Sequence, residues 1–203
     1  MGLKTDAPPG TADTFGQYKL LNILESKEMI IDILGLGESI SLYRTNNNIT
    51  FGVNDIYRKI DVDYLVCVDD KKKFTEDRLK YIENNKAKAF YSQLDCWEYL
   101  PNYQKIELQN RYPDYECDLL SNAIPKSVYS PFIAICLAYK IFKPSIINLY
   151  GVDMINHPHL SNSMTINRIL RHTLNLKVSL NSYCCELIVH GNGILKNLNC
   201  YSI

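Results

Sequence analysis

The residues best suited to chemistry stand in short polar motifs that follow apolar stretches. The first motif is Gly35-Leu36-Gly37-Glu38-Ser39, directly after the apolar run 29–34. Glycines let a phosphate approach the backbone, and a helix beginning there offers free N–H groups. We therefore expect Gly35, Gly37 and Ser39 to bind a nucleotide phosphate. The motif matches neither the dinucleotide fingerprint nor a Walker A loop, so a tight strand–helix turn is the alternative interpretation.

Two further motifs follow the next apolar stretches. Asn54 stands in Gly52-Val53-Asn54-Asp55, and its amide offers both a donor and an acceptor to a base or a ribose. Asp69 stands in Cys67-Val68-Asp69-Asp70, where paired carboxylates suit a ribose or a divalent metal. An Asx turn at the first motif and a capped loop at the second are the structural alternatives.

A fourth motif begins at Gly151-Val152-Asp153 and continues to His157-Pro158-His159. Asp153 is expected to face the nucleotide. A histidine in a polar loop can act as a general base because its pKa lies near neutrality, so His157 and His159 are the catalytic candidates. A metal site is not predicted, since no third ligand stands nearby. A plain surface loop remains the alternative.

The other histidines and the cysteines indicate structure rather than chemistry. His172 and His190 stand apart from other polar clusters, and Cys184-Cys185 has no assignable activating partner. The number of cysteines is odd, 7, and no C-x-x-C pair occurs, so no zinc ribbon is indicated. Reduced, mostly buried thiols are expected.

The elements that must position these motifs alternate between strand and helix. Strands are expected at 29–34, 49–53, 64–68, 87–91, 146–150 and 177–180, and helices from 38, at 75–84, from a Ser130 N-cap to Pro144, and from 161 or 162 to about 174. This alternation predicts an α/β fold: a Rossmann-like, doubly wound, mostly parallel sheet with helices on both faces. Ligands bind beyond the carboxyl ends of such strands, so we expect the motifs to share one crevice.

The composition sets the remaining limits. The chain has 203 residues, with 22 Lys plus Arg and 22 Asp plus Glu. One nucleotide-binding domain at 29–203 is expected, with 1–28 as a flexible leader or extension. The balanced charge gives no reason to expect nucleic-acid binding, and no apolar run is long enough for a membrane span. A cytoplasmic location is expected by default.

The ordered motifs resemble the bacterial lipooligosaccharide sialyltransferases, which use CMP-sialic acid without a metal. They also resemble the broader motility-accessory-factor and 6-hydroxymethylpterin pyrophosphokinase-like proteins. The resemblance covers about residues 29–190, and it includes the helix opened by Tyr129-Ser130-Pro131 and the strand that runs into Gly151-Val152-Asp153. It implies that Gly35, Gly37, Ser39, Asn54 and Ser130 contact the nucleotide. It also implies a downstream histidine base, for which His157 or His159 is the nearest candidate.

The chain departs from the sialyltransferase pattern at two places. Leu36-Gly37-Glu38 replaces a typical Asn-Gly-Pro, which removes one phosphate contact and adds a negative charge. Met154-Ile155 stands where a tyrosine is expected.

The expected function is that of a glycosyltransferase-like enzyme. It would bind a nucleotide-activated sugar of the CMP type and transfer the sugar to an acceptor hydroxyl, with no other cofactor required. One alternative is a pyrophosphokinase-like enzyme that uses magnesium at Asp69, Asp70 and Asp153. The other is a non-catalytic nucleotide-binding protein, which the departures at Leu36 and Glu38 favour.

Overall fold

A computed structural model describes residues 28–109, 117–127, 129–154 and 163–200. Within them, 7 strands form one open sheet in the order β5-β4-β3-β2-β1-β6-β7. Every pair of neighbouring strands is parallel. The strands are β1 (Ile30–Leu34), β2 (Ile49–Val53), β3 (Tyr64–Val66), β4 (Ala89–Ser92), β5 (Tyr103–Lys105), β6 (Ile146–Tyr150) and β7 (Glu186–Val189). The predicted α/β class with a parallel, Rossmann-like sheet is confirmed.

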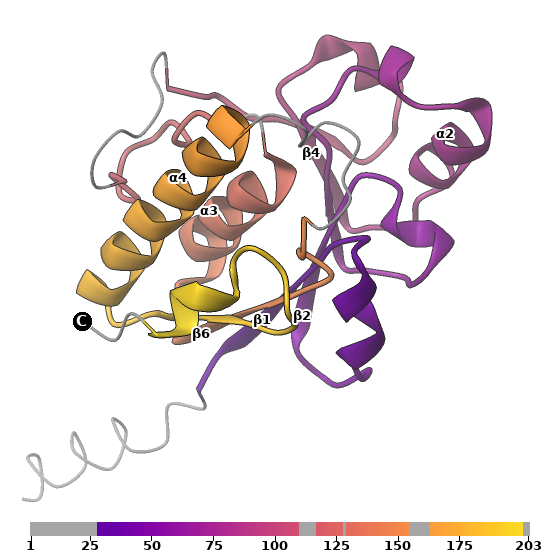
Figure 1. The fold of residues 1–203 in the computed structure, drawn as a ribbon. Coiled ribbons are helices and arrows are strands. Elements are labelled where there is room, and N and C mark those ends of the chain that lie inside the picture. The colour runs from indigo at the N-terminus through magenta and orange to yellow at the C-terminus, as the bar shows by residue number, and fades with distance from the viewer. Residues whose placement is uncertain (1–27, 110–116, 128, 155–162, 201–203) are drawn as a thin grey trace, which may run out of the picture.

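Helices lie on both faces of this sheet (Figure 1). The α-helices are α2 (Glu76–Glu83), α3 (Ser130–Phe142) and α4 (Ser163–Ser182). Short 3-10 helices are η1 (Glu38–Leu42), η2 (Ile56–Arg58), η3 (Lys71–Lys73), η4 (Asp95–Trp97) and η5 (Lys196–Cys200). The order in which strands are added to the sheet reverses at β1, because β2 to β5 extend to one side of it and β6 and β7 to the other. In such folds the crevice for a ligand lies at this reversal.

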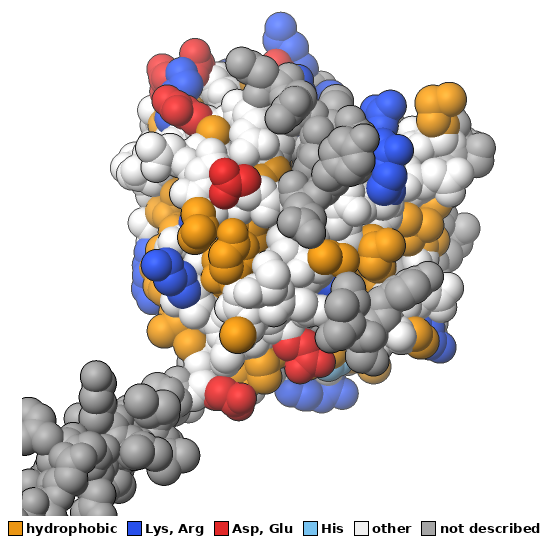
Figure 2. Space-filling view, turned by 90° about the vertical axis from the view of Figure 1, so that its left-hand side faces the viewer, with side chains coloured by type: hydrophobic (Ala, Val, Ile, Leu, Met, Phe, Trp, Pro, Cys, Tyr) orange, Lys and Arg blue, Asp and Glu red, His pale blue; other side chains and the backbone are white. Residues whose placement is uncertain are grey.

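Two hydrophobic cores hold the layers together. Ile31 and Ile33 point to the core that contains α3 and α4, whereas Leu34 points to the core beside α2. All residues of α3 from Ser130 to Tyr139 are buried, as expected of an apolar helix enclosed between other layers. The exposed large hydrophobic side chains come from separate elements, and hydrophobic atoms visible in Figure 2 lie in separate groups with polar atoms between them.

The predicted late strand at 177–180 is wrong, because α4 continues through it to Ser182. Ile169, Thr173, Leu176 and Leu180 are all buried, and their spacing of three to four residues places them on one helix face. The last strand is instead β7, which the sequence analysis did not predict.

Apart from β5, which no predicted strand range covers, the other strands and the α-helices match the expectations with small shifts. The predicted N-cap Ser130 is the first helical residue of α3, and Tyr129 takes the cap position. The segment after Ser39 forms the 3-10 helix η1 rather than an α-helix.

The outer edge of β7 is closed by side chains. The side chain of Asn199 accepts the N–H of Val189 at 2.9 Å and donates to the carbonyl of Val189 at 2.7 Å. Lys177 Nζ, buried within α4, donates to the carbonyl of Leu187 at 3.3 Å and to that of Leu198 at 2.8 Å. These bonds satisfy edge groups that would otherwise be open to another strand.

Of the other residues predicted to be structural, His172 is buried and His190 is partly buried, whereas Cys184 is exposed. His190 Nε2 lies 3.1 Å from Asn148 Oδ1, and its ring stacks on Tyr150 with centroids 4.2 Å apart. Burial lowers the pKa of His190, against the opposing effect of Asp32. His172 is buried, with its ring against Phe132. The cysteines are free thiols, with Cys67, Cys117, Cys136 and Cys185 buried.

None of the helices in the described segments is long and apolar enough to cross a bilayer.

Candidate functional site

The predicted nucleotide-binding residues all lie at the carboxyl ends of the strands, in two groups and one further loop. The first group, called here the glycine cluster, joins the loops after β1 and β6 and consists of Gly35, Gly37, Ser39, Gly151 and Asp153. The second is the asparagine–serine pair, Asn54 and Ser130. The further loop follows β3 and holds Asp69. The structure therefore brings segments distant in sequence to one edge of the sheet.

In the glycine cluster, three backbone donors of the predicted phosphate turn already have partners. The N–H groups of Gly35 and Gly37 donate to the carbonyls of Tyr150 and Gly151, each at 2.7 Å. The N–H of Ser39 donates to Asp153 Oδ2 at 2.7 Å. Ser39 Oγ in turn accepts the N–H of Gly151 at 2.9 Å. A buried carboxylate thus lies at the turn where the sequence predicted a phosphate.

The glycines of this cluster allow the loops to touch. A Cβ on Gly35 would lie 2.3 Å from the carbonyl oxygen of Gly151, and one on Gly37 would lie 2.4 Å from Asp153 Oδ2. Gly193, in the loop after β7, packs equally closely against the backbone of Asp153. Such distances leave no room for a side chain. The glycines are therefore required for the packing of the three loops.

The asparagine–serine pair joins the end of β2 to the start of α3. Ser130 Oγ donates to Asn54 Oδ1 at 3.2 Å, across 76 residues of sequence. Asn54 has a left-handed backbone, with φ of 54°, and its N–H donates to the carbonyl of Val66 at 3.0 Å. Among the described residues, no partner accepts the Nδ2 group of Asn54. That amide is half-buried at a helix N-terminus, where it can donate to a ligand.

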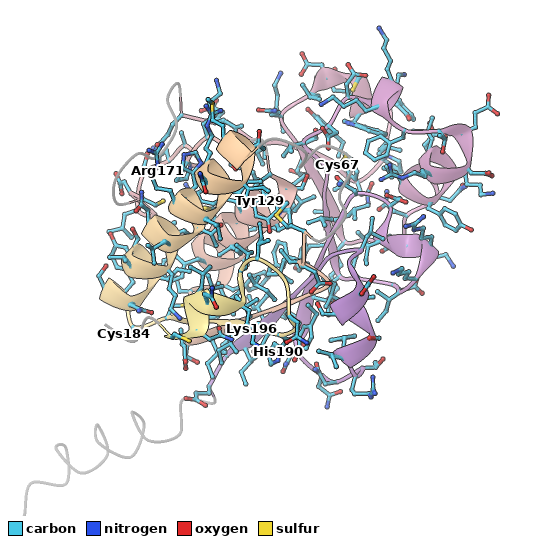
Figure 3. All side chains as sticks on the ribbon, in the orientation of Figure 1. Cys67, Tyr129, Arg171, Cys184, His190 and Lys196 are labelled. Atoms are coloured by element: carbon cyan, nitrogen blue, oxygen red, sulfur yellow. The ribbon has the colours of Figure 1, made fainter. Side chains whose placement is uncertain are left out.

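Tyr129, the N-cap residue of α3 directly before Ser130, adds a buried hydroxyl (labelled in Figure 3). Its side chain is 7% exposed, and the hydroxyl has no hydrogen-bond partner within the described part of the chain. Burial raises the pKa of Tyr129, and the nearby charge of Asp153 raises it further. The phenol is therefore a protonated donor between α3 and the glycine cluster. The sequence analysis placed Tyr129 at the start of the helix but assigned it no role in binding.

Asp69 lies in a loop that is held by hydrogen bonds to the backbone carbonyl of Asp69. The carbonyl of Asp69 accepts the indole N–H of Trp97 at 3.1 Å and the thiol of Cys67 at 3.7 Å. Its carboxylate binds Lys73 Nζ at 2.9 Å and remains partly exposed, with 31% of the side chain accessible. Asp70 caps η3 by accepting the N–H of Lys72 at 2.9 Å.

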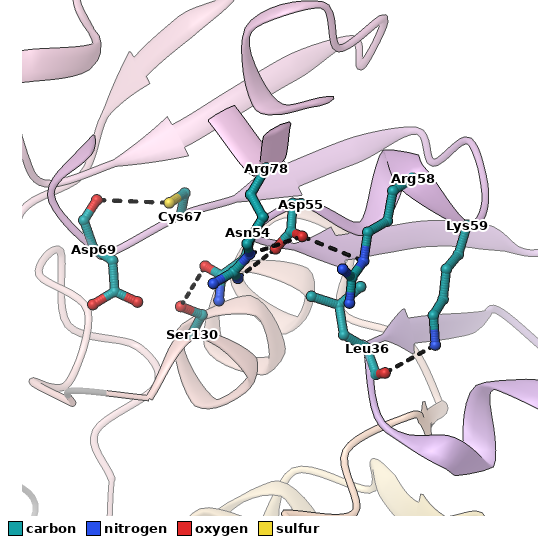
Figure 4. A network of polar contacts seen from close by, with 9 residues as sticks. All are labelled: Leu36, Asn54, Asp55, Arg58, Lys59, Cys67, Asp69, Arg78 and Ser130. Carbon is teal, nitrogen blue, oxygen red and sulfur yellow. Dashed lines mark hydrogen bonds and ion pairs between the residues drawn. The ribbon is translucent and has the colours of Figure 1, made fainter. Parts of the chain in front are cut away.

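An ion-pair network that the sequence analysis missed lies next to Asn54 (Figure 4). Asp55 is fully buried, and both its oxygens bind Arg78, at 2.6 Å to Nη2 and 3.0 Å to Nε. Arg58 Nε lies 3.3 Å from Asp55 Oδ2. The hydrogen bond to Asp55 raises the pKa of Arg78. The signal was present, since Asp55 directly follows Asn54, but nothing in the sequence pairs it with a residue 23 positions later.

The two catalytic candidates, His157 and His159, lie outside the described residues. A surface hollow of about 440 Å³ lies over the first turns of α4, and its described lining consists of Met164, Asn167, Arg168 and Arg171. No cluster of three or more potential metal-binding side chains occurs within the described ranges.

Comparison with family models, curated proteins and solved structures finds no match to this chain. The site must therefore be interpreted from its own geometry.

Proposed function

We propose that the protein binds a nucleotide-activated sugar of the CMP type and transfers the sugar to an acceptor hydroxyl. The observation that carries this proposal is the hydrogen bond from Ser130 Oγ to Asn54 Oδ1 at 3.2 Å. It fixes the Asn54 amide at the carboxyl ends of the strands and at the N-terminus of a 13-residue helix. Ligands of open α/β sheets bind at this edge.

The described residues suit successive parts of such a donor. Asn54 and Ser130 offer an amide and a hydroxyl to the nucleoside, and the exposed oxygens of Asp69 suit ribose hydroxyls. Tyr129 offers a buried phenolic donor near Asp153, on the side of the glycine cluster. That donor would face the sugar.

The transfer itself needs one base and no covalent intermediate. The acceptor oxygen attacks the anomeric carbon, and the bond from that carbon to the phosphate oxygen breaks. Its electron pair leaves with the nucleoside monophosphate, while the hydroxyl proton passes to His157 or His159. The resemblance described above assigns the base to this segment.

Calorimetric titration with CMP, compared with AMP, GMP and UMP, tests the proposal. We expect CMP to bind, and Asn54→Gly to weaken its binding at least about tenfold, the effect of losing one buried hydrogen bond to the ligand. The matched control is Asn102→Gly, at an asparagine near β5 that is remote from this edge in sequence and contacts. If no nucleotide or nucleotide-sugar binds at millimolar concentration, the proposal is wrong.

A further inference from the structure

The phosphate of the proposed donor needs hydrogen-bond donors, and three backbone donors of the glycine cluster are already used. The N–H groups of Gly35, Gly37 and Ser39 all have protein partners. The partner of Ser39 is the carboxylate of Asp153, which is 5% exposed. A phosphate placed there would lie against a buried carboxylate, and like charges at such short range repel. The phosphate must therefore find its donors elsewhere along this edge.

A cationic cluster, consisting of Arg58, Lys59 and Arg78, lies between the asparagine–serine pair and the glycine turn. Lys59 Nζ donates to the carbonyl of Leu36 at 3.0 Å, so it reaches the turn after β1. Both arginines reach Asp55, the residue after Asn54. In Figure 4 the labelled residues form a row in space, from Asp69 at the left, past Asn54 and Asp55, to Leu36 and Lys59 at the right.

The charges of this cluster are not balanced within it. One buried carboxylate, that of Asp55, binds two guanidinium groups, and the partner of Lys59 among the described residues is a carbonyl. The side chains of Arg58 and Arg78 are 42% and 37% exposed. Asp55 binds Nε of Arg58 and both Nε and Nη2 of Arg78. Both terminal nitrogens of Arg58, and Nη1 of Arg78, therefore make no contact with Asp55. Arginine forks held in place by a carboxylate suit the bidentate binding of phosphate.

We propose that Arg58, Lys59 and Arg78 form the phosphate subsite of the nucleotide site, with Asp55 as the positioning residue that orients the two arginines. This inference rests on the proposed function for the nucleoside that the phosphate carries. The order along the edge is then nucleoside at Asn54 and Ser130, phosphate at the cationic cluster, and sugar toward Asp153. The glycine turn has a packing role in this arrangement.

Titrations of the full chain with cytidine, CMP and inorganic pyrophosphate test this subsite. Arg58→Gln removes an exposed cation and leaves the Arg78–Asp55 pair in place. We expect it to weaken CMP binding about tenfold, the effect of losing one charge-assisted contact, while cytidine binding stays within about twofold. Lys59→Gln is expected to act in the same direction, and pyrophosphate should compete with CMP. Lys80→Gln is the matched control, because Lys80 lies on α2, where it forms an ion pair with the exposed Asp77 and lies over the ring of Tyr81.

The outcomes separate the two proposals. Equal losses for cytidine and CMP, or no loss for either in Arg58→Gln, would overturn the phosphate subsite while the nucleotide site stands. If wild-type protein binds pyrophosphate in a manner that depends on Arg58 but binds neither cytidine nor CMP, the proposed function fails and an anion site remains. If none of the three probes binds, both proposals are wrong.

Discussion

The carboxylate of Asp153 accepts the backbone N–H of Ser39 at 2.7 Å, and this bond ties the loop after β6 to the loop after β1. Because the bond is buried, Asp153→Ala leaves the Ser39 N–H without a partner. We expect a loss of about 1–3 kcal/mol in the free energy of unfolding, measured by urea denaturation. Asp153→Asn, which keeps an acceptor oxygen, should lose less. Asp61→Ala, at an exposed position, serves as the control, and equal stability of all variants would contradict the role of this bond.

Gly35→Ala should also destabilise the fold, for a steric reason. The added Cβ would lie 2.3 Å from the carbonyl oxygen of Gly151, so the two loops would have to separate. Overpacking of this kind costs about 1–3 kcal/mol, and thermal unfolding would show it as a lowered Tm. Ser41→Ala, on the exposed side of η1, is expected to leave the Tm within about a degree, as typical surface changes do. An unchanged Tm for Gly35→Ala would show that the loops can move apart freely.

Asn54 offers a way to separate backbone strain from ligand contact. Its φ of 54° suits Asn and Gly but strains Ala. We expect Asn54→Gly to keep most of the stability and Asn54→Ala to lose about 1 kcal/mol more, in urea titrations of both variants. Both should lose CMP binding to a similar degree, since both lack the amide. CMP binding by Asn54→Gly at wild-type strength would argue against a ligand contact.

Tyr129→Phe should have opposite effects on stability and on ligand binding. The phenol is buried with no partner among the described residues, so its removal costs the folded protein little and can raise the Tm. The same change should weaken binding of a CMP-sugar while leaving CMP binding unchanged, because the hydroxyl is the group that we propose to contact the sugar. Calorimetry with both ligands measures the difference. A large drop in Tm would indicate instead that the hydroxyl has a structural partner.

The lowered pKa of Asp63 lets us predict how the free energy of unfolding changes at acidic pH. Burial alone would raise its pKa, but hydrogen bonds from Lys88 and Thr50 outweigh this and hold the pKa below the usual 3.8. Thr50 donates through both its N–H and its hydroxyl, each at 3.0 Å. A pKa lowered by folding means that the unfolded chain takes up the proton first. The contribution is therefore complete above the unfolded value and is lost as the pH falls through the folded one.

We expect Asp63→Asn to lower stability at pH 7 and to flatten the decline below about pH 4, in urea unfolding across pH. Glu76→Gln, an exposed carboxylate at the start of α2, is the control. A decline in Asp63→Asn as steep as in wild type would show that other groups dominate.

The sequence predicted the sheet because its strands are short apolar runs that end at glycines or polar residues. Five of the strands were located by this pattern, but β5 and β7 were not. β5 has only three residues, two of them polar, and in β7 Glu186 interrupts a short apolar run directly after a long helix. The late strand was wrongly placed at 177–180 for the same reason, since a brief apolar stretch does not distinguish a strand from a buried helix turn.

The candidate site was predictable only as an edge of the sheet. Turn residues such as Gly35 and Asn54 were found because glycine and asparagine mark strand ends. The partners that define their roles, Asp153 for Ser39 and Arg78 for Asp55, come from distant segments, and sequence spacing carries no information on such contacts. The sequence alone therefore could not show that the carboxylate of Asp153 binds the glycine turn; the fold was needed to show it.

The amide of Asn199 occupies both hydrogen-bonding groups of Val189, as a neighbouring strand would. A second molecule that approached this margin would have to displace the chain's own terminal segment before pairing could begin. At the β7 edge, these bonds therefore oppose the addition of a strand from a second molecule, the kind of pairing by which fibrils grow. Truncation before residue 199 would remove that protection while leaving every strand of the sheet present.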